Sequence, residues 1–130
     1  MPITLSTALA ALLLAPSAVP SEDAPAPITD LAQLPITEAT APRCAIAFAI
    51  VSQWQQEGDP RGQGWPDMQT GGAREFFVQA MAALMDAQRL DRSALLGVVA
   101  RESERLQADG DDRIGAMMPA CLSIKQAAGL

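Results

Sequence analysis

The sequence predicts an all-α protein: a four-helix up-down bundle stapled by one disulfide, preceded by a signal peptide and a Pro/Ala-rich linker. Hydrophobic residues make up 49% of the 130 positions, aromatic residues only 4%, and Tyr is absent. This mixture, rich in Ala and Leu, favours helices over strands. Four segments after residue 42 repeat apolar residues at steps of three and four. One cysteine lies near each end of that region, at Cys44 and Cys121.

Residues 1–17 are predicted to be a signal peptide. The apolar stretch from Ile3 to Ala15 is too short for a bilayer, which needs about 20 residues, but it suits the apolar centre of a signal. Pro16 ends the stretch, and Ala15 and Ser17 have the small size found before cleavage sites. No Lys or Arg precedes the stretch, and a buried N-terminal helix is the alternative. We expect a periplasmic or secreted protein without stable membrane insertion after processing.

Residues 18–42 are predicted to be a linker, mostly disordered. Prolines recur through this tract, and proline removes backbone donors and blocks helix formation. The alternative is that the segment ITDLAQLPI docks on the domain. Its apolar side chains are Ile28, Leu31, Leu34 and Ile36. A solvated tether is the preferred interpretation, so the helical domain is expected to span residues 43–130.

The first helix is expected over residues 41–56, with Thr40 as its N-cap and Pro42 in its first turn. The second is expected from Ala73 to about Arg89, after Gly72. The apolar faces are formed by Cys44, Ala47, Phe48, Val51 and Trp54 in the first helix, and by Phe76, Phe77, Ala80, Met81, Leu84 and Met85 in the second.

The third helix is expected to start after the N-cap Asp91 and to end at Gly110, a residue suited to the left-handed conformation. Gly97 in its interior indicates a close approach to another helix. Glu102 and Arg105 are expected to pair on the exposed side. The apolar stripe is expected to contain Leu95, Leu96, Val99 and Leu106.

The fourth helix is expected from Asp111 or Asp112 to about Ala128, with a kink or a break at Pro119. In an up-down bundle the end of this helix lies beside the start of the first. Cys44 and Cys121 would then meet, and export favours their oxidation to a disulfide. Two buried free thiols are the alternative.

The connection from Glu57 to Gly72 is the most unusual segment, because structureless loops of this length are uncommon in compact domains and are often functional. It carries Trp65 and Met68, which are the candidate partner contacts. A Trp in a polar loop is a typical anchor for a partner surface. The alternative is that Trp65 folds back over the helices as a cover.

Composition and motifs argue against several other classes of function. A net charge of −6 argues against nucleic-acid binding. The absence of His removes the commonest metal ligand and general base, and two cysteines alone do not make a zinc site. The acidic run at residues 109–112 lacks the bidentate Glu of a calcium loop, since the twelfth position is Ala120. We therefore predict no catalytic residues, no metal and no cofactor.

Three segments carry a resemblance: RCAIAFAIV, AREFFVQAMAALMDAQRL and MMPACLSI. Over about residues 43–128 the chain resembles a group of short exported alphaproteobacterial proteins of unknown function. The disulfide-stapled helical architecture is also similar to that of periplasmic acid-stress chaperones and of some immunity proteins for secreted effectors.

These observations predict a non-enzymatic periplasmic module that binds another protein, either chaperone-like or inhibitory. The alternative is a carrier of an apolar small ligand between the helices, because Met-rich surfaces adapt to such ligands. Core packing is the other interpretation of the methionines Met81, Met85, Met117 and Met118.

Overall fold

A computed structural model describes residues 26–130, and every regular element in that range is a helix. The predicted signal peptide and the first part of the predicted linker lie outside the described residues. A 3₁₀ helix, η1 (Leu31–Gln33), is followed by α1 (Ile36–Gln56), α2 (Pro60–Gln63), α3 (Ala73–Gln88), α4 (Arg92–Ala108) and α5 (Asp111–Ala127). The predicted all-α class is therefore confirmed.

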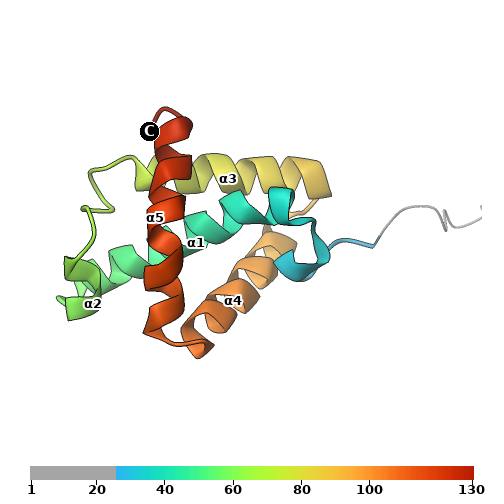
Figure 1. The fold of residues 1–130 in the computed structure, drawn as a ribbon. Coiled ribbons are helices and arrows are strands. Elements are labelled where there is room, and N and C mark those ends of the chain that lie inside the picture. Colours follow the sequence, from blue (N-terminus) through green and yellow to red (C-terminus); the bar gives the residue numbers. More distant parts are fainter. Residues whose placement is uncertain (1–25) are drawn as a thin grey trace, which may run out of the picture.

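Helix α1 runs through the middle of the molecule, and all the other helices contact it (Figure 1). The reason is visible in its sequence, where Cys44, Ala45, Ile46, Ala47 and Phe48 are five successive apolar residues. All five are buried. They cover more than one turn, so α1 is enclosed on every side along this stretch, as expected for a helix that is apolar all round.

The described helices do not show the predicted four-helix up-down arrangement. Five α-helices are present, and α5 crosses α1 instead of running along it (Figure 1). The prediction placed Cys44 at the beginning of the first helix, beside the end of the last. Because α1 begins earlier than expected, Cys44 lies well inside it, and the disulfide joins the interiors of two crossing helices.

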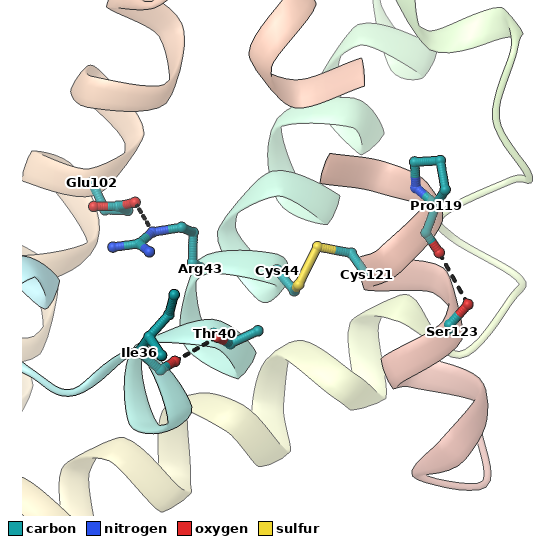
Figure 2. The surroundings of a disulfide bond; sticks show 8 residues. All are labelled: Ile36, Thr40, Arg43, Cys44, Glu102, Pro119, Cys121 and Ser123. Carbon is teal, nitrogen blue, oxygen red and sulfur yellow. Dashed lines mark hydrogen bonds and ion pairs between the residues drawn. A yellow bond between two sulfur atoms is a disulfide. The ribbon is translucent and has the colours of Figure 1, made fainter. Parts of the chain in front are cut away.

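The first helix begins at Ile36, earlier than the predicted start at residue 41. Thr40 is therefore not its N-cap: its hydroxyl lies within the helix and donates to the carbonyl of Ile36 (Figure 2). Pro42 is also internal and buried. Proline lacks an N–H donor, but its fixed φ is compatible with a helix, and here the ring contributes apolar surface to the core.

The C-terminal part of the predicted linker belongs to the folded body. Leu31 is fully buried, and Ile28 and Leu34 pack against the core, whereas Ile36 is 75% exposed. A capping box orders this segment, because Asp30 accepts from the Ala32 N–H and the Gln33 side chain accepts from the Asp30 N–H. The predicted start of the folded domain at residue 43 is therefore too late. Residues 28–34 instead follow the alternative prediction, in which this segment docks on the domain.

The later helix boundaries agree with the sequence predictions. Asp91 caps α4 by accepting from the Ala94 N–H at 2.7 Å, and Gly110 takes a positive φ between α4 and α5. Helix α5 continues through Pro119 without a break. Gly97 is exposed with nothing near its missing Cβ, so the predicted close helix approach is wrong. Within residues 26–130, no helix has both the length and the apolarity needed to cross a membrane.

Candidate functional site

The predicted disulfide is present. Cys44 of α1 and Cys121 of α5 are both buried, with their Cα atoms 5.2 Å apart (Figure 2). This separation lies in the ordinary range for disulfides. Because the bond is enclosed by the core, it acts as a structural staple between the two crossing helices.

The connection from Glu57 to Gly72 is ordered by one amide side chain, that of Gln55. Its Nε2 donates to the carbonyl oxygens of Gly62 at 3.0 Å and Pro66 at 2.9 Å. Its Oε1 accepts from the N–H of Met68 at 3.0 Å. One side chain at the end of α1 thus satisfies backbone groups at three points of the connection, which is not the structureless loop that its composition indicates.

A short turn of helix, α2, closes the first part of this connection. Asp59 caps it by accepting from the Arg61 N–H at 3.0 Å and also pairs with the Arg61 guanidinium. The side-chain hydrogen bond from Arg61 is the main reason that the pKa of Asp59 falls to about 2. The same guanidinium lies 4.4 Å from the ring centre of Trp54, so a cation–π contact joins α2 to α1.

The two predicted partner contacts lie in this connection but differ in exposure. Met68 is 3% exposed and belongs to the core, so only a small part of its side chain is accessible, where it lines a hollow beside the connection. Trp65 is half-buried and packs against the core, which agrees with the covering role considered for it. The accessible part of Trp65 lines a hollow beside the connection. The predicted contact of Trp65 with a partner protein therefore remains a proposal.

Two adjoining hollows run along the second half of α1, where it faces the connection and the start of α3. The apolar hollow has a volume of about 540 Å³ and the polar hollow about 430 Å³. Gln56 and Gln69 line both, so the two hollows lie next to each other, and we call the pair the α1 groove.

The two hollows are named for the side chains that line them, although each exposes about as much polar as apolar surface. Buried Phe48 and Met68 and half-buried Phe77 line the apolar hollow, with Ser52 and Arg74 as polar neighbours. Side-chain amides, carboxylates and one indole ring line the polar hollow. These side chains are Gln55, Gln63, Trp65, Asp59 and Asp67.

Arg74 supplies the charge of the apolar hollow. It is exposed, and it forms no ion pair with any residue in the described part of the chain. Asp67 and Asp59 place negative charge in the polar hollow, and Arg61 neutralises Asp59. The α1 groove is therefore positive at its apolar end and weakly negative at its polar end.

A second cluster of charges lies on the N-terminal side of the molecule. Glu102 of α4 is 1% exposed and accepts from Arg43 of α1 at 2.6 Å and from Arg105 at 2.7 Å (Figure 2 shows the Arg43 pair). Arg105 also pairs with Asp30 beside η1. The hydrogen bond from Arg105 is the main reason that the pKa of Asp30 lies below its usual 3.8. This cluster ties three elements together and has no cavity beside it among those described, so we assign it to stability.

The placement of Glu102 corrects the sequence prediction, which put it on the exposed side of α4. The buried stripe of α4 runs through Val98, Glu102 and Leu106 at steps of four, and Leu96 is exposed. The apolar residues on either side of Glu102 in this row were a usable signal. No comparable signal exists for Gln55, because its role depends on the path of the connection.

Residues 26–130 contain no group of three or more His, Cys, Asp or Glu side chains placed to hold a metal ion. Comparison with protein-family models, with curated proteins and with solved structures finds no match for this chain. The resemblance to short alphaproteobacterial proteins remains a prediction. What the fold defines is a disulfide-stapled, all-helical protein built around one central helix, and any role for it rests on its own residues.

Proposed function

We propose that this protein is a non-enzymatic, exported binding module whose α1 groove holds an extended segment of a partner protein. The observation that carries the proposal is the groove itself, in which the apolar hollow and the polar hollow lie next to each other and share Gln56 and Gln69. Peptide-binding sites combine pockets for apolar side chains with polar groups that pair with the peptide backbone.

The amides shared by the two hollows favour a peptide as the occupant. A Gln side chain carries the same donor and acceptor groups as a peptide bond. The side-chain amide of Gln69 makes no hydrogen bond to the rest of residues 26–130, although the backbone N–H of Gln69 donates to Asp67. The side chain of Gln56 uses only its Nε2, toward Ser52. Both side chains therefore have unused hydrogen-bonding groups in the middle of the groove.

The groove supports a peptide better than the apolar-ligand carrier that the sequence also suggested. A carrier encloses its ligand in apolar surface. The apolar hollow instead has exposed Gln56, Gln69 and Arg74 among its lining residues, and it adjoins the polar hollow. These polar side chains suit a peptide backbone and would leave a lipid chain poorly covered.

The binding experiment uses the full-length, oxidised protein and libraries of short random peptides. Ala49 is an exposed α1 residue that lines the apolar hollow, so Ala49→Trp should fill the groove without disturbing the core. Ala100 is an equally exposed helical alanine outside both hollows, and Ala100→Trp is the matched control. We expect selected peptides to lose affinity at least about tenfold with Ala49→Trp only. Failure to select any peptide, or equal effects of the two substitutions, would contradict the proposal.

Export is tested separately, on protein isolated from its natural host. A buried disulfide is typical of oxidising compartments, and this supports the export part of the proposal. We expect intact-mass analysis to show a chain shortened near residue 17 and lacking two hydrogen atoms because of the disulfide. A chain that retains its leader and has two alkylatable thiols would contradict export.

A further inference from the structure

The charge and shape of the α1 groove point to a particular kind of segment. We infer that the apolar hollow takes the C-terminal residue of the partner, with its apolar side chain against Phe77 and its α-carboxylate on Arg74. This inference rests on the proposed function, because it names the partner chemistry of the same groove.

Charge complementarity favours a carboxylate as the group that binds at the apolar hollow. The chain has a net charge of −6, yet the only charged residue lining the apolar hollow is Arg74. That guanidinium is exposed and has no carboxylate partner within residues 26–130. The arginines that contact buried side chains, Arg43, Arg61 and Arg105, are all paired. An arginine left without a partner beside an apolar hollow is complementary to a carboxylate that adjoins apolar surface.

The geometry of an extended chain then selects the source of that carboxylate. Successive side chains of an extended segment point to opposite sides, so an internal acid next to an apolar residue would point away from the groove. An acid two positions away would lie on the same side but about 7 Å further along the segment. A C-terminal residue carries its apolar side chain and its carboxylate on the same Cα. One residue can therefore satisfy the apolar lining and Arg74 together.

The rest of the groove suits the residues that precede this C-terminus. Gln56 and Gln69 lie where the two hollows meet and have amide groups free to pair with the backbone of the preceding residue. The polar hollow beyond them offers Trp65 and the carboxylate of Asp67, which also accepts from the Gln69 N–H at 2.9 Å. Both groups suit a polar or basic side chain. A C-terminal apolar residue preceded by polar or basic residues is therefore the expected motif.

The test uses peptides selected from a library displayed with free C-termini, measured by fluorescence anisotropy on the full-length oxidised protein. We expect a C-terminal amide, and likewise one added C-terminal Gly, to weaken binding at least about tenfold. Arg74→Gln should weaken binding of the free-acid peptide by a similar factor and should abolish the difference in affinity between the acid and amide peptides. Arg74→Lys should retain part of this difference. Arg92→Gln removes the same charge from an exposed helical site outside the groove and should change affinity less than about twofold.

The outcomes separate this inference from the proposed function. Peptides that bind and are displaced by Ala49→Trp, but bind equally as acid and amide, would overturn the inference and leave the groove as a binding site. Binding that depends on Arg74 and on an internal Asp or Glu would also overturn it, by assigning the guanidinium to a side-chain acid. A lack of any peptide binding would overturn both.

Discussion

Replacement of Glu102 tests the most unusual packing in the molecule, a carboxylate with a side chain fully removed from solvent between two guanidinium groups. Loss of one partner from a buried ion pair costs about 3–5 kcal/mol, because the remaining charge is left without compensation. The side chains of Arg43 and Arg105 are 21% and 32% exposed, so both recover part of their hydration. We therefore expect Glu102→Gln to lower the free energy of unfolding by about 2 kcal/mol and Glu102→Ala by about 3 kcal/mol.

The assay is urea unfolding of the oxidised protein followed by circular dichroism, with the midpoint and the slope fitted separately. Glu104→Gln is the matched control, because Glu104 is exposed on the same helix, and it should change stability by less than about 0.5 kcal/mol. A double-mutant cycle between Glu102→Gln and Arg43→Met should give a coupling of at least about 0.5 kcal/mol, as expected for residues in contact. Equal effects of Glu102→Gln and Glu104→Gln would refute the buried position of this carboxylate.

Three further predictions concern the disulfide and the N-terminal segment. The 77-residue separation of Cys44 and Cys121 corresponds to a stabilisation of about 4.5 kcal/mol in the chain-entropy model. The variant with both cysteines replaced by Ala should therefore lose about 2–5 kcal/mol of its free energy of unfolding, measured in urea. An unchanged urea midpoint would contradict this prediction. Because the folded pKa of Asp30 is lowered from its usual 3.8, its stabilising contribution should be fully present above about pH 5 and should decrease as the pH falls through the lowered pKa. Asp30→Asn should therefore be less stable than the wild type at about pH 6, and the difference should shrink as the pH is lowered below about 4. Leu31→Ala should cost about 2–4 kcal/mol by thermal or urea unfolding, whereas a solvated tether would show no effect.

The helical class and most helix boundaries could be predicted because they depend on local signals. Asp91 caps a helix in the sequence and in the structure, and Gly110 takes the positive φ expected of it. The predicted start of α1 is wrong, because the prediction places Pro42 in the first turn of the helix, whereas α1 begins six residues before it. Pro42 is instead tolerated inside a helix that is buried around it, where apolar packing outweighs the missing donor.

The arrangement of the helices and the groove depends on contacts that no local pattern encodes. The cysteines indicated correctly that α1 and α5 meet, but a single cross-link does not specify the angle between two helices. The α1 groove exists because Gln55 holds the connection from Glu57 to Gly72 in one path, and its hydrogen bonds join residues 7 to 13 positions away. Composition alone therefore marked this connection as unusual without showing which side chains line the groove.

The enclosure of α1 from Cys44 to Phe48 has a consequence for sequence variation. An ordinary surface helix accepts changes on alternate faces, so a saturation scan along it shows a tolerance that rises and falls with each turn. Along these five positions no face is open, so the scan should show one uninterrupted block in which only small or apolar replacements survive. Diverged versions of this chain would then be easiest to find by this block together with Cys121, because the sequences of the outer helices are less constrained.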